Sequence, residues 1–195
     1  GADNIAIGRS ALAVSGNDAD CNIAIGLSAL GGADVSGLAN IAVGALSADA
    51  LTTGICNVAI GVNALGASTT GCLNVAIGEL AMGATDVTGT DNIAIGTTSM
   101  DALTSGATNI AMGKNAMGAS TTTSNSIALG QNALGDAITT GVNNIAIGCG
   151  VAADITSGAV NIAMGEGAYR TATTGCFNVA IGGGAIGTGI TTGID

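Results

Sequence analysis

The chain has 195 residues with 3 basic and 13 acidic side chains, a net charge of −10, and no His, Pro or Trp. Nucleic acid and anionic membrane surfaces both require clustered Lys and Arg, and the only basic residues, Arg9, Lys114 and Arg170, are far apart in the sequence. The missing His removes the commonest general base and metal ligand. No apolar run reaches the length of about 18 residues that a membrane-spanning helix requires.

A pentapeptide returns eleven times, with Asn (once Ser126) at position 1, Ile or Val at position 2, Ala at position 3, an apolar residue at position 4 and Gly at position 5. Successive copies start 17 or 18 residues apart. A period this short and regular indicates one unit stacked on itself. We therefore expect one repeat array over 1–195, a section of a longer fibre. The copies are at 4–8, 22–26, 40–44, 57–61, 74–78, 92–96, 109–113, 126–130, 144–148, 161–165 and 178–182.

Each pentapeptide alternates large apolar residues at positions 2 and 4 with small or polar residues at positions 1, 3 and 5. This is the two-residue period of a strand. We expect the side chains at positions 2 and 4 to fill the interior, and a Leu or Met in the middle of each unit to close the core. The glycine at position 5 is expected to form a corner with positive φ.

A second segment of each unit carries Val or Thr, usually two residues before another glycine, and β-branched residues favour a second strand. These residues are Val14, Val35, Thr52, Thr69, Val87, Thr104, Thr121, Thr139, Thr156, Thr173 and Thr191.

A short helix in each unit is the alternative, because Ala and Leu are good helix formers. However, glycine recurs throughout, and each interior glycine costs a helix about 1 kcal/mol relative to alanine. Helical solenoid units are also longer, at about 33–47 residues. The sequence therefore predicts an all-β fold, a parallel β-solenoid (β-roll) of eleven coils of 17–18 residues.

Stacking such coils places equivalent residues in columns. The asparagines at position 1 are expected to stack their amides from coil to coil as a structural polar ladder. The members of this ladder are Asn4, Asn22, Asn40, Asn57, Asn74, Asn92, Asn109, Asn144, Asn161 and Asn178.

The invariant alanine at position 3 alternates with the expected core residues and is therefore expected to face outward. A flat strip of alanine suits close approach of another chain, and long apolar strips rarely stay exposed on a monomer. We therefore expect this strip to pack between chains, as three rods around one axis or as a filament. A coil too flat for larger side chains is the alternative explanation. The strip comprises Ala6, Ala24, Ala42, Ala59, Ala76, Ala94, Ala111, Ala128, Ala146, Ala163 and Ala180.

The stretch Asn125-Ser126-Ile127-Ala128-Leu129-Gly130 is similar to a recurrent Asn-Ser-Val-Ala-Ile-Gly motif, and 143–148 is nearly as close. On these residues the unit resembles the head repeat of trimeric autotransporter adhesins and similar repeats in phage tail fibres. The resemblance implies a left-handed parallel β-roll, three chains around one axis, and an extracellular fibre that projects or binds.

No constellation of nucleophile, base and orienting residue is present, because His is absent. The Gly-Gly-x-Gly-x-Asp pattern of calcium-binding β-rolls is also missing. We expect no enzyme activity, no metal and no cofactor.

The five cysteines do not form an obvious set of disulfides. Cys21 and Cys56 share a column but are two coils apart, about 9.6 Å at the strand spacing, whereas a disulfide spans at most about 7 Å between Cα atoms. We expect small buried thiols, with an interchain bridge as the alternative. The cysteines are Cys21, Cys56, Cys72, Cys149 and Cys176.

A hydroxyl directly precedes the second glycine in nearly every unit. Such an array resembles the threonine face of insect-type ice-binding solenoids, and ice binding is the alternative function. Those proteins present Thr-x-Thr, whereas adjacent hydroxyls here would leave one column in water and turn the other away. A hydroxyl ladder within the sheet is the simpler explanation. The column contains Ser15, Ser36, Ser105, Ser157 and the candidate ice-binding residues Thr53, Thr70, Thr88, Thr122, Thr140, Thr174 and Thr192.

These observations predict a structural and adhesive protein, a rigid extracellular fibre segment on a cell surface or virion. Its expected partners are further copies of itself and an unidentified receptor or surface. Neither nucleic acid nor a membrane span is expected.

Overall fold

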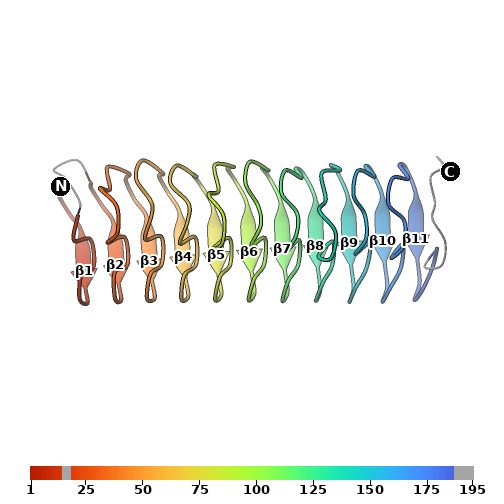
Figure 1. The fold of residues 1–195 in the computed structure, drawn as a ribbon, viewed down its shortest axis with the longest axis horizontal. Coiled ribbons are helices and arrows are strands. Elements are labelled where there is room, and N and C mark those ends of the chain that lie inside the picture. The colour runs from red at the N-terminus through yellow and green to blue at the C-terminus, as the bar shows by residue number, and fades with distance from the viewer. Residues whose placement is uncertain (15–18, 187–195) are drawn as a thin grey trace.

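The computed structural model describes residues 1–14 and 19–186. Each pentapeptide forms a three-residue strand, and the eleven strands pair in chain order into one parallel sheet along a rod, with β1 at one end of the sheet and β11 at the other (Figure 1). The predicted all-β parallel solenoid is confirmed, and no helix occurs within the described ranges, so the helical alternative is wrong. The strands are β1 Ile5–Ile7, β2 Ile23–Ile25, β3 Ile41–Val43, β4 Val58–Ile60, β5 Val75–Ile77, β6 Ile93–Ile95, β7 Ile110–Met112, β8 Ile127–Leu129, β9 Ile145–Ile147, β10 Ile162–Met164 and β11 Val179–Ile181.

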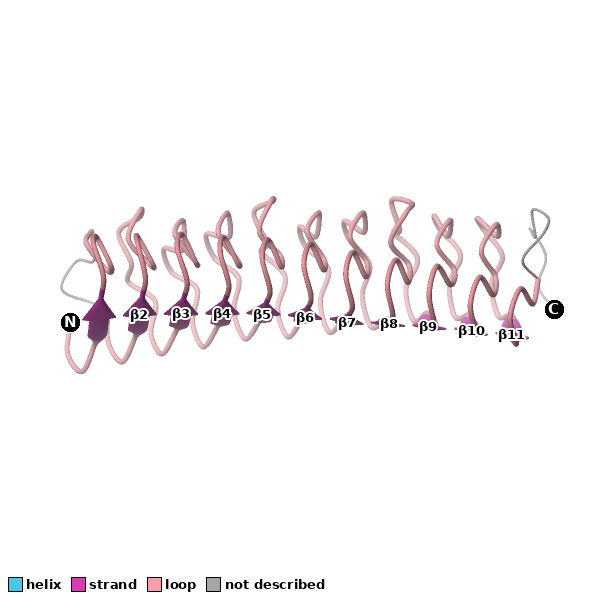
Figure 2. Ribbon diagram, turned by 90° about the horizontal axis from the view of Figure 1, so that it is seen from below, coloured by secondary structure: helices cyan, strands magenta, loops and turns pink. Residues whose placement is uncertain are grey.

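We number each coil by its strand, so that a coil runs from position 1 of its pentapeptide to the residue before the next one. Coil 2 is then 22–39, coil 6 is 92–108 and coil 7 is 109–125. Equivalent positions pair throughout the sheet, as in Ala111↔Ala128 between β7 and β8. Like residues therefore stack on like residues, and the coils follow one another along the rod with the same outline (Figure 2).

The strands are short because a glycine ends each one. Gly96, for example, has φ 134°, and a Cβ there would lie 2.6 Å from the carbonyl oxygen of Gly113 in the next coil. The corner therefore excludes side chains and requires positive φ, as predicted.

Three more residues in each coil adopt the left-handed conformation although most of them are not glycine. In coil 6 they are Thr98 (φ 53°), Met100 (φ 51°) and Thr108 (φ 57°). This conformation costs an L-residue about 1–2 kcal/mol. Their N–H groups donate to carbonyl oxygens of adjacent coils, Glu79, Ala116 and Thr90, each at 3.0 Å. Contacts between coils thus maintain a backbone that the residues alone do not favour.

The core consists largely of Leu and Met from the middle of the units, as predicted, with Ala48, Ala152 and Tyr169 in their place in coils 3, 9 and 10. Leu30, Leu65, Met82, Met100 and Leu134 are all fully buried. They extend from the wall opposite the sheet and fill the narrow interior.

The orientation of the sheet is the reverse of the prediction. The alanines at position 3 face inward, and the side chains at positions 2 and 4 face out. The core residues from the opposite wall leave room for no more than a methyl group beneath the sheet. The proposed outward strip is therefore wrong, because Ala24, Ala42, Ala59, Ala76, Ala94, Ala111, Ala128, Ala146, Ala163 and Ala180 are 0–2% exposed, and only Ala6 in coil 1 is exposed.

The predicted second strand is also wrong, because the described part of that segment contains no strand. The segment contains no strand even in coil 7, where Thr123 replaces the glycine, so the glycine alone is not the cause. A left-handed residue, such as Asn125 with φ 55°, turns the chain before the next pentapeptide. In coils of 17 residues the residue before the threonine, such as Leu51 or Leu103, enters the core. The threonine hydroxyl then donates to the next coil, as from Thr52 Oγ1 to the Thr69 carbonyl oxygen at 2.9 Å.

The longer coils recur with their own period. From Asn22 onward the coil lengths run 18, 17, 17 three times, which divides 22–177 into three blocks of 52 residues. The extra residue of each block lies in the loop, and the β-branched residue itself then enters the core as Val35, Val87 or Thr139. A change of one residue thus decides which side chain becomes buried.

The asparagine column lies inside the rod and forms a continuous hydrogen-bonded ladder. The Asn40 N–H donates to Asn22 Oδ1 at 2.8 Å, and Asn40 Nδ2 donates to Asn22 Oδ1 at 3.1 Å and to the Gly54 carbonyl oxygen at 2.9 Å. The same N–H to Oδ1 bond links Asn57, Asn74, Asn92, Asn109, Asn161 and Asn178 to the preceding asparagine. Each buried amide is therefore supplied with partners, as burial requires.

The ladder changes where coil 7 meets coil 8, at two residues together. Ser126 replaces the asparagine, and Thr123 replaces the glycine three residues earlier. The Ser126 Oγ accepts the N–H of Asn144 at 3.1 Å, while Thr123 Oγ1 donates to the Gly141 carbonyl oxygen at 2.5 Å. The threonine hydroxyl thus makes the bond that a longer asparagine side chain makes elsewhere.

We predict that these two residues are energetically coupled. Ser126→Asn alone should destabilise the fold by about 1–3 kcal/mol, because the amide would overlap the Thr123 side chain. Thr123→Gly alone should cost about 1–3 kcal/mol, because the buried Gly141 carbonyl loses its donor. The double variant restores the regular pair and should recover most of both losses. Urea unfolding of the four proteins measures the coupling, and additive losses would show that the two sites are independent.

Candidate interaction face

The outward side chains of the sheet form a continuous surface that we call the apolar face. It takes two residues from each strand, and all of them are Ile, Val, Leu or Met. Its two columns are Ile5, Ile23, Ile41, Val58, Val75, Ile93, Ile110, Ile127, Ile145, Ile162 and Val179, and Ile7, Ile25, Val43, Ile60, Ile77, Ile95, Met112, Leu129, Ile147, Met164 and Ile181.

The apolar face is flat and regular because every strand has the same length and pairs in register without a bulge. At the strand spacing it is about 48 Å long, and its two columns are about 7 Å apart. No segment within residues 1–14 and 19–186 covers it. Away from the chain ends, Ile60 is 38% exposed, Met112 44% and Met164 38%.

A surface of this kind is unusual on an isolated chain. With the width of the side chains included, the face covers about 600 Å², at the upper limit of the largest apolar patch on a typical monomer, about 300–600 Å². Most other members of the face in coils 2–10 are only partly exposed, and burying the remainder of each side chain would contribute about 0.5 kcal/mol. The face has no hydrogen-bonding side chain, so it can bind another surface only by apolar packing.

Several acidic residues lie in the loops that complete each coil. They include Asp34, Asp86, Asp136 and Asp154, whose side chains are exposed or partly exposed. Asp101 Oδ1 accepts the Ala84 N–H at 3.0 Å, and burial nevertheless raises the pKa of the Asp101 carboxyl above its ordinary value. Glu79 and Asp91 instead border the apolar face, directly after and directly before a pentapeptide. The apolar face itself is therefore uncharged, with some charged side chains at its margins and further acidic residues in the loops.

The hydroxyl column lies in a separate part of the surface. One hydroxyl per coil faces solvent while its neighbour turns inward or bonds along the rod, as from Thr104 Oγ1 to the Thr121 carbonyl oxygen at 2.9 Å. Thr88 and Thr140 donate to the next coil at 3.3 Å. Ser15 and Thr192 lie outside the described residues. The exposed members are Ser36, Thr53, Thr70, Thr88, Ser105, Thr122, Thr140, Ser157 and Thr174.

The expectation that the thiols are buried is wrong for three of the five cysteines. Cys21, Cys56 and Cys149 are exposed, and all five are free thiols. Cys72 and Cys176 are half-buried and accept backbone N–H groups of Ile55 and Ala159 at 3.4 Å. These two occupy the same place in the first and third blocks of 52 residues.

The remaining surface is shallow. Within the described residues no pocket opens on the rod, and no three His, Cys, Asp or Glu side chains come together as metal ligands would. The same part of the chain contains no helix that could cross a bilayer. No protein-family model, curated protein or solved structure matches the chain.

The apolar face was not predicted, because the alternation of large and small residues is the same for either orientation of the strand. The informative residue was the alanine at position 3, because no copy of the pentapeptide has a larger residue there. A position that tolerates only a methyl group in every coil is typical of a tightly packed interior.

We predict opposite tolerances at neighbouring residues of β7. Ala111→Val should destabilise the fold by about 1–3 kcal/mol, because the fully buried alanine has no space for two more methyl groups. Ile110→Val removes one methylene from the outward face and should change stability by less than about 0.5 kcal/mol. Urea midpoints of both variants at one protein concentration make the comparison, and a tolerated Ala111→Val would contradict the inward orientation.

Proposed function

We propose that this chain is a rigid, self-associating segment of an extracellular structural and adhesive fibre, on a cell surface or virion. The observation that carries the proposal is the apolar face, which the described residues of the chain leave uncovered. Other copies of the same chain are the partner that a repetitive, flat and featureless surface fits best. Adhesion to a receptor or surface would then use the parts of the assembly that stay exposed.

The interior of the rod suits a mechanical role. Each inner coil is held by backbone hydrogen bonds to both neighbours, as for Ile23 N–H to the Asn40 carbonyl oxygen at 2.8 Å and Gly26 N–H to the Ile7 carbonyl oxygen at 2.8 Å. The asparagine ladder repeats this connection with buried side chains. A fold stabilised by nearest-neighbour contacts lengthens without a new core being needed.

Three rods around one axis is the arrangement that we propose. It turns the apolar faces toward the axis and the acidic loops outward, where they are farthest apart. With a net charge of −10 per chain, loop-side contact between copies is disfavoured by repulsion. Charge therefore favours association through the sheet side alone.

We predict a mass of three times 18.2 kDa at micromolar concentration. Ile93→Asp with Ile127→Asp places charges on the apolar face of coils 6 and 8 and should give monomers, because an unpaired charge cannot be buried cheaply. Sedimentation equilibrium measures the mass.

The matched control is Ser105→Asp with Thr140→Asp, which puts the same charges on the exposed hydroxyl column of the same coils. It should leave the mass unchanged. A monomeric wild-type chain at about 10 µM, or equal dissociation of both variants, would refute the proposal.

Ice binding is the second candidate, favoured by the unbroken exposure of one hydroxyl per coil from Ser36 to Thr174. If it is correct, the purified protein should show thermal hysteresis, which Thr70→Tyr with Thr140→Tyr should abolish by disrupting the flat column. The Ile93→Asp, Ile127→Asp variant should retain the hysteresis. Unchanged freezing behaviour at high concentration of the wild-type protein excludes this function.

A further inference from the structure

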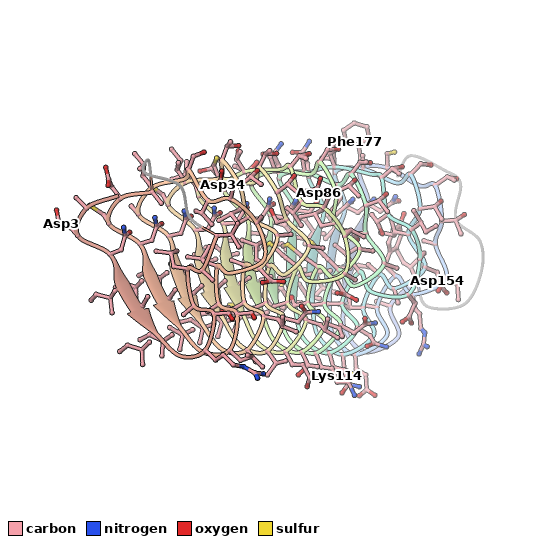
Figure 3. All side chains as sticks on the ribbon, turned by 60° about the vertical axis from the view of Figure 1, so that its left-hand side comes forward. Asp3, Asp34, Asp86, Lys114, Asp154 and Phe177 are labelled. Atoms are coloured by element: carbon pink, nitrogen blue, oxygen red, sulfur yellow. The ribbon has the colours of Figure 1, made fainter. Side chains whose placement is uncertain are left out.

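A straight, shallow channel runs along the middle of the apolar face. Its walls are the two columns of outward side chains, and its floor is the backbone at position 3, whose alanines face inward and are 0–2% exposed in coils 2–11. Because the strands pair in register without a bulge, no side chain interrupts the channel between β1 and β11. The margins of the face, at Lys114 after a pentapeptide and Phe177 before one, lie on opposite sides of the rod (Figure 3). The channel is therefore open to solvent and is not a pocket.

The floor of the channel offers no free hydrogen-bonding group in the inner coils, because the N–H and C=O groups of the strands point along the rod. In coil 6 the Ile93 N–H donates to the Asn109 carbonyl oxygen at 2.8 Å. The Gly96 N–H donates in the other direction, to the Ile77 carbonyl oxygen at 2.8 Å. A ligand in the channel can therefore gain only apolar contacts from the walls and the floor.

The width of the channel selects the shape of a ligand. Residues two apart in a strand are separated by about 7 Å, and carbon atoms in contact by about 3.5–4.0 Å. One layer of carbon atoms therefore fits between the walls, and a second layer does not. One wall is Ile or Val in every coil, and such β-branched side chains are restricted at χ1, so the wall is regular. This geometry suits a flat aromatic molecule that stands on edge with its long axis along the rod.

The charge around the channel adds a second criterion. Glu79, Asp91 and Glu166 are exposed beside the apolar face, and the basic residues there are Arg9 and Lys114. The whole chain carries a net charge of −10. A negative field of this kind raises the concentration of cations at the surface. The complementary ligand is therefore positively charged as well as flat.

We propose that this channel binds elongated, flat aromatic cations, which lie along the rod between the two columns. A cation of two or three linked rings spans about four coils, because successive coils are about 4.8 Å apart. The site does not depend on self-association, but a copy packed on the apolar face would cover it. A bound cation and a second copy therefore compete for the same surface, and ligands of this class should oppose assembly of the fibre.

The probe is thioflavin T, a benzothiazole cation whose fluorescence rises when its two ring systems are held coplanar. The titration uses the wild-type chain at a concentration at which sedimentation shows monomers. If the wild-type chain does not dissociate, it uses the Ile93→Asp, Ile127→Asp variant, whose coils 1–5 keep an unbroken channel. Saturable binding to the monomer is expected, and the dye bound per wild-type chain should fall as the mass rises to that of the trimer.

Three lysines on one wall interrupt the channel in coils 3, 6 and 9 and leave no free run longer than two coils, which is too short for the dye. This variant should raise the dissociation constant of thioflavin T by at least about tenfold. Its substitutions are Ile41→Lys, Ile93→Lys and Ile145→Lys.

The matched control adds the same charge to the exposed hydroxyl column of the same coils, so it weakens the long-range attraction equally and leaves the channel intact. It should raise the dissociation constant by less than about threefold. Its substitutions are Thr53→Lys, Ser105→Lys and Ser157→Lys. Equal effects of the two variants, with folding verified by circular dichroism, would overturn the proposal.

A second measurement requires no variant of the channel. A propeller-shaped triarylmethane cation has the same charge as thioflavin T and a larger apolar surface, so adsorption without a defined site would favour it. Its twisted rings are thicker than one layer of carbon atoms, and its dissociation constant should be at least about tenfold higher. Equal affinity for the two cations, or no binding of thioflavin T to the monomer, would also overturn the proposal. Sedimentation tests self-association separately, because a chain that stays monomeric refutes the proposed function and leaves the channel open to the dye.

Discussion

The whole structure depends on one constraint, the in-register stacking of coils at the strand spacing. Every residue has as its nearest neighbours the residues 17 or 18 positions before and after it, so each column must be compatible with itself. Charges cannot satisfy this requirement inside the rod, whereas an amide can, because it both donates and accepts. The buried asparagine column, the glycine corner and the alanine layer each meet this requirement, because each residue type can stack on a copy of itself.

The repeat made the fold class, the coil count, the glycine corner and the Leu or Met core predictable, because period and composition determine them directly. The orientation of the sheet was not predictable from alternation. Ile110 and Ala111 exchange roles if the strand turns over, and only the narrow space left by Met100 and Met117 decides which of them is inside. The left-handed residues were not predictable either, because Thr98 and Met100 are not residue types that usually adopt that conformation.

The orientation of the sheet determines how copies of the chain could associate. With alanine outside, association would rest on close backbone approach along a narrow strip. With Ile and Val outside, it rests on burial of apolar surface, which is less specific and far stronger per residue. A surface of that kind needs other features to limit where copies attach. The acidic loops discourage contact on one side of the rod, and the exposed charges of Glu79 and Asp91 interrupt the margins of the apolar face.

The asparagine ladder also gives the rod an internal direction. Each amide oxygen receives hydrogen bonds from the following coil, so neighbouring amide dipoles align and polarise one another. Ser126 interrupts this alignment, because a hydroxyl accepts the N–H of Asn144 without an amide to pass the polarisation on. The rod therefore contains two electrically separate runs of amides, from Asn4 to Asn109 and from Asn144 to Asn178. Coil 8 is the joint between them, although the backbone pairs across it as elsewhere, with the Ile127 N–H donating to the Asn144 carbonyl oxygen at 2.8 Å.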